Sequence, residues 1–345
     1  MTSAAPSTSW RENAAPDEST RYESQAQLLH QLQESSTMRL GRNGRALHRK
    51  GHLGARASFE VLPDLPAPFA AGLFATPATY RAYVRFSNGA FAHNADTKPD
   101  VRGIAVKVLG VTGKKLIPGL EDAPTQDFLA IQSPVTPFRN SDEFVKAVYA
   151  GRKLSLALPR FIAAFGFRRA LAILRGFTAE VGVKIPTLSQ QRFFSALPVR
   201  YGAYAAKYSF VPAARPDGSP NPSASDHYAQ DLATRLLRAP MAYDFAVQLY
   251  RDEKSTPIED ASIEWSQDVA PFVTVARLVL PVQDVRSPGG QKLTDFVEQL
   301  SFDPWHALVE HRPLGDMMRA RNAAYRVSTQ ARHAAAEPDG SERLE

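Results

Sequence analysis

The sequence predicts an α+β fold, a large antiparallel β-barrel with inserted and C-terminal helices. Three observations predict this class. Apolar and polar residues alternate over much of residues 54–109, helical periodicity replaces this pattern over residues 141–182, and the chain closes on a second helical region. Turn-forming Gly, Pro, Asn and Asp residues separate the alternating segments, as expected for strands joined by turns.

The predicted elements follow in a simple order. A polar helical arm over residues 24–38 precedes the first strands, and a Pro-, Asp-, Gly- and Ser-rich loop over residues 212–226 divides the later ones. Pro159 is expected to break the central helical region, because proline lacks the N–H that an interior helical position donates. The expected strands are 57–61, 83–87, 103–108, 127–131, 199–210, 241–251 and 272–280, and the expected closing helices are 294–300 and 316–332.

The composition is that of an ordinary globular protein. Apolar residues make up 44% and charged residues 22% of the 345-residue chain. We expect a folded domain over residues 24–333 between disordered tails at 1–23 and 334–345. The N-terminal segment has no apolar core and resembles neither a signal peptide nor a membrane anchor, so we expect a cytoplasmic location.

Several site classes are excluded or disfavoured. The chain has no cysteine, which excludes disulfides, thiolate-ligated haem, iron–sulfur clusters and zinc–thiolate sites. The net charge of +6 is modest, and the arginines are dispersed rather than clustered with aromatic residues. We therefore expect no nucleic-acid partner.

The most informative spacing lies near the C-terminus, where Arg321 precedes Tyr325 by four residues in a helical pattern after Asp316, a candidate N-cap. A free tyrosine keeps its proton up to about pH 10, but an arginine one helical turn away favours the phenolate. A tyrosine phenolate is a ligand for ferric haem iron. Arg200 precedes Tyr204 by the same spacing, but in a strand-like run, where residues four apart are separated by about 13 Å.

A second informative segment, residues 44–54, contains His48. A neutral imidazole near physiological pH can take a proton from one oxygen of a peroxide and return it to the other. The alternative is a metal pair of His48 and His52, as in a metal hydrolase. Gly51 argues against a regular helix there, and no glutamate follows His48 as in zinc hydrolases. We therefore disfavour the metal pair.

Ordered sequence blocks surround these residues and span residues 44–332. They are Arg45-x-x-His48-x-Lys50-Gly51 with Phe59-Glu60-Val61, Val84-Arg85-Phe86-Ser87 with Ala95-Asp96-Thr97, residues 102–107, residues 127–135, and Phe302-Asp303-Pro304-Trp305 leading to Arg321-x-x-x-Tyr325. In this order they resemble the haem catalase superfamily. The likeness is greatest to the short catalase-related haem proteins, the catalase-related peroxidases, which lack the extra C-terminal domain of the large catalases.

The resemblance implies haem b as the cofactor and a role for each matched residue. Tyr325 would be the proximal iron ligand, and His48 would be the distal acid–base catalyst. Guanidinium groups suit the haem propionates, because they pair with carboxylates in a bidentate geometry. The implied cofactor-binding residues are Arg321 beside the ligand, Arg45, Arg85 and Arg332 for the propionates, Leu47 and Ile131 in the dry pocket, and Phe144 against the haem.

The chain departs from the family at the distal asparagine, whose position falls on Ile131. An isoleucine donates no hydrogen bond to peroxide, and the adjacent Gln132 is expected to face the other side of its strand. We expect His48 to support the first peroxide cleavage, whereas a second hydrogen peroxide would be poorly oriented. The departure therefore predicts a peroxidase-leaning enzyme with weaker catalase turnover.

The insert over residues 154–177 is rich in apolar residues and carries Arg160, Arg168, Arg169 and Arg175. We favour a helix packed on the barrel with these arginines at its rim. The alternative is an amphipathic basic helix that associates weakly with a membrane or lipid.

The leading hypothesis is a haem-dependent catalase or peroxidase, active in the response to oxidative stress, whose substrate is hydrogen peroxide or an organic or lipid hydroperoxide. A second hypothesis is a fatty-acid hydroperoxide isomerase or dehydratase similar to allene oxide synthase. A third, from another class, is a haem-binding or sensing protein without catalysis. The sequence leaves open the physiological peroxide, the electron donor, nucleotide binding and assembly into a homo-oligomer.

Overall fold

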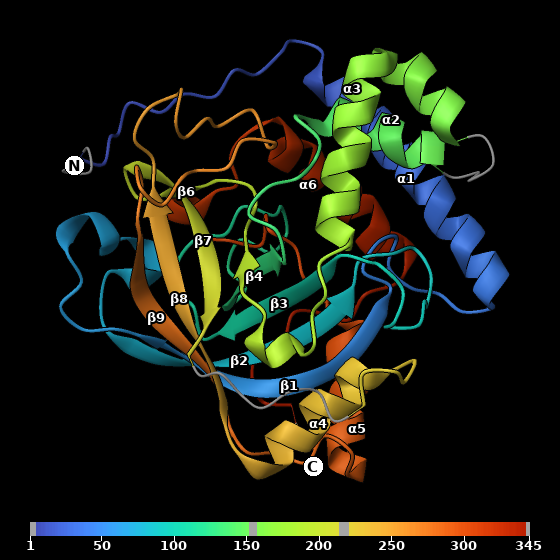
Figure 1. The fold of residues 1–345 in the computed structure, drawn as a ribbon. Helices are drawn as coiled ribbons and strands as arrows, with labels where there is room; N and C mark the ends of the chain where they lie inside the picture. Colours follow the sequence, from blue (N-terminus) through green and yellow to red (C-terminus); the bar gives the residue numbers. More distant parts are fainter. Residues whose placement is uncertain (1–4, 152–156, 214–220, 343–345) are drawn as a thin grey trace.

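Eight antiparallel strands close into a barrel in the computed structural model, which describes residues 5–151, 157–213 and 221–342. The sheet runs in the order β5-β4-β3-β2-β1-β9-β8-β7, and pairing of β5 with β7 closes it (Figure 1). A further short strand, β6 (Val199–Tyr201), pairs with β7 outside this ring. The barrel strands are β1 (Lys50–Val61), β2 (Ala78–Asn88), β3 (Arg102–Leu109), β4 (Thr125–Ile131), β5 (Phe193–Phe194), β7 (Tyr204–Pro212), β8 (Met241–Leu249) and β9 (Phe272–Leu280). The predicted barrel is confirmed.

Aromatic side chains fill the barrel interior, because alternate residues of each strand point inward. The ring of Phe245 in β8 lies 5.4 Å from that of Phe59 in β1 and 4.9 Å from that of Phe128 in β4. Phe74 stacks on Phe245 at 5.5 Å, and all four side chains are buried. The interior is a packed core, so a large ligand has to bind outside the barrel wall.

The C-terminal part of the chain covers the outer face of the first strands. Helix α5 (Pro288–Gln299) packs on β1 and β2, and its Leu293 and Val297 form a second apolar cluster with Tyr83 of β2. Helix α6 (Asp316–Ala331) packs along α1 (Glu18–Leu40). Figure 1 shows both C-terminal helices outside the barrel wall.

Three inserted helices lie at two ends of the molecule. Helices α2 (Ser141–Gly151) and α3 (Ala157–Val181) pack together beside α1, whereas α4 (His227–Arg238) lies near α5 at the opposite end (Figure 1). Short 3₁₀ turns occupy some of the connections, namely η1 (Ala67–Phe69), η2 (Gly72–Phe74), η4 (Leu188–Gln190) and η5 (Val309–His311).

Several local predictions were wrong. Pro159 lies in the first turn of α3, where proline is tolerated, and the non-helical residue of α3 is Gly166, with φ of 70°. The strand expected over 199–210 is a hairpin, because Gly202, with φ of 60°, turns the chain between β6 and β7. Asp316 is the first residue of α6, and Gly315 holds the N-cap position. Neither α4 nor the two-residue β5 was predicted.

Both segments expected as disordered tails contact the folded body within the described residues. Helix α1 begins at Glu18 rather than at residue 24, and the preceding Glu12 pairs with Arg319 at 2.7 Å. After residue 334, Glu337 pairs with Lys107 of β3 at 2.6 Å. Residues 1–4 and 343–345 lie outside the described part of the chain.

The tail carboxylate of Glu337 completes a buried ionic cluster. Lys107 is fully buried and lies 2.7 Å from a carboxylate oxygen of Asp127. Glu337 also accepts the hydroxyl hydrogen of Thr125 at 2.8 Å. Burial opposes the charge on Glu337, but Lys107 and its other partners outweigh this and lower its pKa, whereas burial raises the pKa of Asp127 to about 8. Glu337 is therefore the anion that balances the buried lysine.

We predict that Glu337→Gln lowers the free energy of unfolding by about 2 kcal/mol, because it removes an ionised partner from a buried lysine. Urea denaturation measures the change. Asp339→Asn is the matched control, because that tail carboxylate is exposed and bonds to Ser341 within the tail. Equal stability of the two variants would contradict the anchoring role of Glu337.

Candidate functional site

Three strands align small residues on the outer face of the barrel. The register pairs Ser87 of β2 with Gly103 of β3, and Gly103 with Ile131 of β4. Paired residues of antiparallel strands project from the same face. A Cβ atom at Gly103 would lie 2.7 Å from Cε1 of His48, so only glycine leaves room for this imidazole. The ring of His48 therefore lies over the strands, on the face that Ile131 shares.

His48 is fixed through both its ring and its backbone carbonyl. Its φ of 52° is uncommon for a residue with a side chain. Its Nδ1 lies 3.0 Å from the hydroxyl oxygen of Ser87, and its carbonyl accepts a hydrogen bond from Arg85 at 2.8 Å. Burial, and then the positive charge of nearby arginines, lowers the pKa of His48 to about 3. The imidazole is therefore neutral at physiological pH.

Arg321 and Tyr325 form the contact that their spacing predicts. On α6, Nη2 of Arg321 donates to the phenolic oxygen of Tyr325 at 2.7 Å, and the guanidinium carbon lies 5.0 Å from the ring centroid. Burial opposes the charge on Arg321, but the oxygen of Tyr325 outweighs it and raises the Arg321 pKa. A full positive charge therefore lies beside the phenolic oxygen of Tyr325.

The start of α6 is fixed by Asp316. Its carboxylate accepts hydrogen bonds from the backbone N–H of Ser141 at 2.7 Å and from the hydroxyl of Tyr22 at 3.0 Å. Because Ser141 begins α2 and Tyr22 belongs to α1, one carboxylate joins three helices. The indole N–H of Trp305 donates to the carbonyl of Met318 at 2.7 Å, which fixes the next turn. These contacts position the helix that carries Tyr325.

Three arginines from distant parts of the chain converge at the end of α5. Arg85 donates to both carboxylate oxygens of Glu298, at 2.7 and 3.1 Å, and Arg45 donates to the same carboxylate. Arg45 and Arg332 both donate to the carbonyl of Leu300, at 2.7 and 2.6 Å. The three residues that the resemblance assigns to propionates are therefore neighbours.

This arginine cluster (Arg45, Arg85 and Arg332) carries surplus positive charge. Glu298 is the one carboxylate that pairs with it in the described part of the chain. Burial and then Arg85 lower the pKa of Arg45, and burial lowers that of Arg332 to about 10 although Glu298 opposes it. Arginines keep their protons at neutral pH. Two more carboxylates would balance the cluster.

The two halves of the site are electrostatically coupled. The charge of Arg321 contributes to the low pKa of His48, and the oxygen of Tyr325 opposes the lowering of the Arg45 pKa. Charge–charge interactions weaken with distance and with intervening water. His48, Arg45 and Arg321–Tyr325 therefore lie within electrostatic range of one another.

The predicted apolar positions are Leu47, Ile131 and Phe144, and each is half-buried. Ile131 shares the face on which His48 lies. Phe144, on α2, packs edge-to-face on Phe138 at 5.5 Å and belongs to a different layer from the strands. Gln132 is engaged elsewhere: its side-chain oxygen accepts from Arg102 N–H at 2.8 Å, and its side-chain nitrogen donates to Glu180 O at 2.6 Å.

The alternative metal pair receives no support from the geometry. The Nε2 atom of His52 lies 2.8 Å from the side-chain oxygen of Asn88, and its Nδ1 lies 3.8 Å from Asp96. His48 is engaged by Ser87 instead. Among the described residues, no group of three or more His, Cys, Asp or Glu side chains is placed to hold a metal ion.

The sequence reasoning missed two partners of the predicted residues. Ser87 lies in one of the matching blocks, but no role was predicted for it. Glu298 was not predicted as a site residue. An acidic residue on a helix carries no local signal of its partners. The pairing of Arg45 and Arg85 with a protein carboxylate becomes visible only when α5 is placed on β1 and β2.

Solved catalase structures share this fold. A bacterial catalase aligns with a TM-score of 0.62 at 17% identity, over 96% of this chain and 63% of that one. A fungal catalase aligns with a TM-score of 0.60 at 17% identity, over 88% and 62%. Catalase A from Saccharomyces cerevisiae gives 0.64 at 18% identity, over 84% and 61%.

The likeness is one of fold. The chain spans about three fifths of the length of each of these catalases. No protein-family model matches the sequence, and no curated protein matches it. The expectation of a catalase-type barrel is confirmed, whereas the likeness to the short catalase-related proteins stays a prediction.

The residues present fit a haem. The arginine cluster lacks two negative charges, which is the number that two propionates supply. Gly103 leaves the space above the strands in which the imidazole of His48 lies. Leu47 and Ile131 are apolar and only half-buried, as expected of side chains that a flat apolar ring would cover. A hollow of about 330 Å³ between α4 and α5 contains none of the predicted site residues.

We predict that Glu298→Gln lowers the free energy of unfolding of the haem-free protein by about 2 kcal/mol, because charge-assisted hydrogen bonds to two arginines are lost. The half-buried position of Glu298 limits the loss. Asp295→Asn, an exposed carboxylate on the same helix, is the control for urea denaturation. If Glu298→Gln were as stable as Asp295→Asn, the carboxylate of Glu298 would not stabilise the arginine cluster.

We predict that His48 stays neutral down to about pH 4. Its pKa of about 3 in the fold lies below the value of about 6.5 in the unfolded chain. The unfolded chain then binds more protons, so stability is full above pH 6.5 and is lost as the pH falls toward 3. Nuclear magnetic resonance of the labelled imidazole measures the titration. A midpoint near 6.5 would contradict the burial of His48 among arginines.

Proposed function

We propose that this chain is a haem-dependent enzyme that decomposes peroxides, with haem b bound between Tyr325 and His48. The observation that carries the proposal is the arginine cluster, which pairs with a single protein carboxylate and contacts His48 through Arg85, together with the Arg321–Tyr325 hydrogen bond. The catalase fold supports the same conclusion.

Each residue of the site has a role in this proposal. When bound, haem supplies a ferric iron that binds peroxide and that peroxide can oxidise. Tyr325 would hold the iron through its phenolic oxygen, to which Arg321 donates a hydrogen bond. The arginine cluster would bind the propionates, and Glu298 would remain to fix the geometry of Arg45 and Arg85. Leu47, Ile131 and Phe144 would exclude water from the ring.

His48 performs the proton transfer. Ser87 engages Nδ1, so Nε2 is the atom available to the substrate on the opposite side of the ring. The neutral Nε2 accepts the proton of one peroxide oxygen and returns it to the other oxygen, which leaves as water or, from an organic hydroperoxide, as an alcohol. The low pKa of His48 keeps Nε2 unprotonated before the reaction. The imidazolium is disfavoured among the arginines, so return of the proton is favoured.

The position of Ile131 favours peroxidase over catalase turnover. Its side chain shares the face of His48, and the amide of Gln132 is occupied by Arg102 and Glu180. A second hydrogen peroxide would meet one polar group where two are needed to orient it. An organic electron donor would then complete the cycle more readily than a second peroxide.

A second candidate reaction is the rearrangement of a lipid hydroperoxide by an isomerase or dehydratase. The observation in its favour is the apolar Ile131 beside His48, since an apolar distal pocket suits an acyl chain. Product analysis separates the two reactions. Oxygen release, or consumption of a reductant, indicates peroxide decomposition, whereas a rearranged lipid without a reductant indicates the isomerase.

A haem-binding or sensing protein without turnover is the third candidate. It predicts full haem loading with negligible reaction toward hydrogen peroxide and toward fatty-acid hydroperoxides. A role in oxidative stress, a cytoplasmic location, independence from nucleic acid and assembly into a homo-oligomer remain parts of the proposal rather than findings.

We predict that Tyr325→Phe abolishes the ferric tyrosinate–haem absorption spectrum and lowers peroxide turnover at least about 100-fold, because phenylalanine offers no iron ligand. Absorption spectra of the haem-loaded proteins measure the first effect. Tyr204→Phe is the control, because Arg200 donates to Gly202 O and not to that tyrosine. A tyrosinate spectrum that survives Tyr325→Phe would refute the assignment.

We predict that Ile131→Asn raises oxygen release from hydrogen peroxide about tenfold, the effect of one hydrogen bond of about 1.4 kcal/mol in the transition state. An oxygen electrode measures the rate. Ile131→Val, which adds no donor, is expected to leave the rate unchanged. Equal rates in the two variants would show that a polar group at this position is not what limits catalase turnover.

A further inference from the structure

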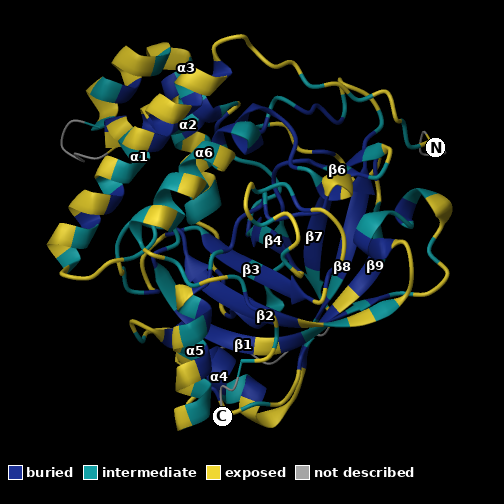
Figure 2. Ribbon diagram, turned by 180° about the vertical axis from the view of Figure 1, so that it is seen from behind, coloured by how far each residue is buried: buried dark blue, intermediate teal, exposed yellow. Residues whose placement is uncertain are grey.

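Helix α3 presents large apolar side chains to solvent. Phe167 is 66% exposed and Leu158 is 57% exposed, and Ile162, Leu171 and Phe177 are also exposed. In Figure 2, exposed segments run along α3, which lies outside the barrel beside α2. Residues 154–177 were expected to pack on the barrel; most contacts of α3 are with α2, and its buried Phe161, Ala170 and Ile173 belong to the apolar cluster that also contains barrel residues. Residues 154–156 of that segment lie outside the described part of the chain.

One side of α3 is fixed to the body. Phe161, Ala170 and Ile173 are its buried residues. Arg169 pairs with Glu143 of α2. At the far end, the backbone carbonyl of Glu180 accepts the side-chain hydrogen bond of Gln132. Gly166 divides α3 into two helical segments, and these contacts fix the one that follows it. The outward side of α3 is defined here by Phe167, Arg168, Leu171 and Arg175, which lie on that second segment.

The outward side of α3 is basic as well as apolar. Arg168 and Arg175 are exposed and lie seven residues, about two helical turns, apart. Phe167 and Leu171 are four residues apart and form an adjacent row on the helix. The single acidic residue between positions 157 and 185 is Glu180, and burial raises its pKa to about 7. Acidic groups therefore do little to offset the exposed arginines.

We propose that the outward side of α3 docks on an anionic lipid membrane. Phe167 and Leu171 would enter the boundary between headgroups and acyl chains, while Arg168 and Arg175 would pair with lipid phosphates. No helix of the described residues is long and apolar enough to cross a bilayer. The helix would therefore lie on the membrane surface.

Charge favours a membrane over a second copy of this chain as the occupant. In a two-fold dimer through α3, the same patch faces itself, so Arg168 and Arg175 of both copies would be brought together. Like charges repel most where water is excluded. Anionic headgroups neutralise the same arginines. The surface therefore fits a negatively charged partner with an apolar layer beneath.

The proposed docking is independent of the peroxide reaction.

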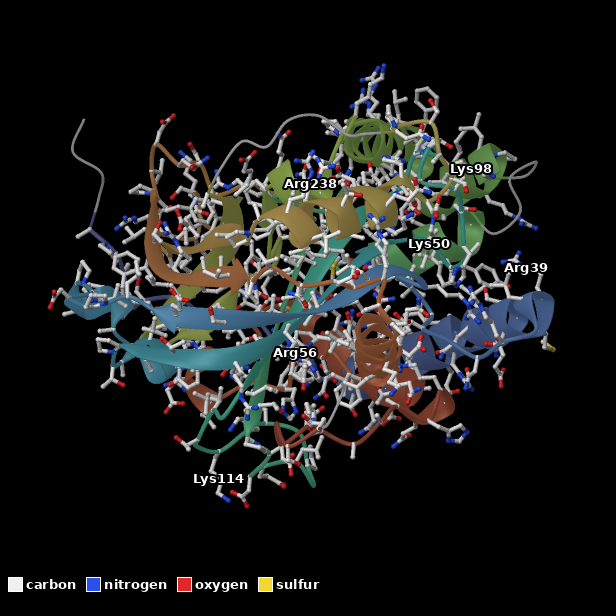
Figure 3. All side chains as sticks on the ribbon, turned by 90° about the horizontal axis from the view of Figure 1, so that it is seen from below. Arg39, Lys50, Arg56, Lys98, Lys114 and Arg238 are labelled. Atoms are coloured by element: carbon white, nitrogen blue, oxygen red, sulfur yellow. The ribbon has the colours of Figure 1, made fainter. Side chains whose placement is uncertain are left out.

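Flotation of the full chain with vesicles tests the proposal. Vesicles of phosphatidylcholine with one quarter phosphatidylglycerol are compared with vesicles of phosphatidylcholine alone. The double variant F167S/R168E on α3 removes one apolar and one basic group. The matched control is L237S/R238E on α4, where Leu237 is 51% exposed and Arg238 is exposed next to it. Figure 3 labels Arg238 on that helix, and Figure 1 places α4 at the end of the molecule opposite to α3.

The proposal expects binding to the anionic vesicles, at least tenfold weaker binding of F167S/R168E, and unchanged binding of L237S/R238E. Circular dichroism confirms that both variants are folded. Absence of binding by the unaltered chain, or an equal loss in both variants, would overturn the proposal. So would a dimer in sedimentation analysis that only F167S/R168E dissociates, since a second copy would then cover α3.

Discussion

The surplus of guanidinium charge on the outer face of the barrel is the constraint on which the rest of the site depends. Arg45 and Arg85 pair with Glu298, and Arg332 joins Arg45 at the carbonyl of Leu300. A fourth arginine, Arg321, donates to Tyr325. Buried like charges repel strongly and are stable only with anions close by. Glu298 is one such anion, and the oxygen of Tyr325 accepts a hydrogen bond from Arg321. His48 stays neutral because a further positive charge would be costly at this position.

The inner face of the barrel forms the core, whereas the outer face carries the candidate site. Its interior is filled by aromatic side chains, and such a core tolerates many apolar replacements. This tolerance explains how the fold persists at 17–18% identity to known catalases. The outer face of β2, β3 and β4 tolerates fewer replacements than the core. Gly103 has to leave room for His48, and Ser87 has to contact its ring. Ile131 is the departure on that face with the clearest chemical consequence.

Much of the fold and of the site could be predicted, and the failures have physical causes. Alternation predicts the long strands well, because the residues that enter the barrel recur at every second position. It fails for the two-residue β5, which is too short to show a period, and for α4, which follows a loop-like segment. The Arg321–Tyr325 contact is predictable because helical spacing fixes it. Glu298 and Glu337 are not, since each acts through residues more than 200 positions away.

The central claim is that the site binds a dianionic haem through its unbalanced arginines and the Tyr325 phenolate. Titration of the haem-free protein with haemin and with haemin dimethyl ester, whose propionates are uncharged, tests it most directly. The account predicts that esterification weakens binding at least about 100-fold, since each charge-assisted contact is worth about 1.5–3 kcal/mol. It also predicts that lowering the salt concentration widens the difference. Equal affinity for the two porphyrins would contradict the account.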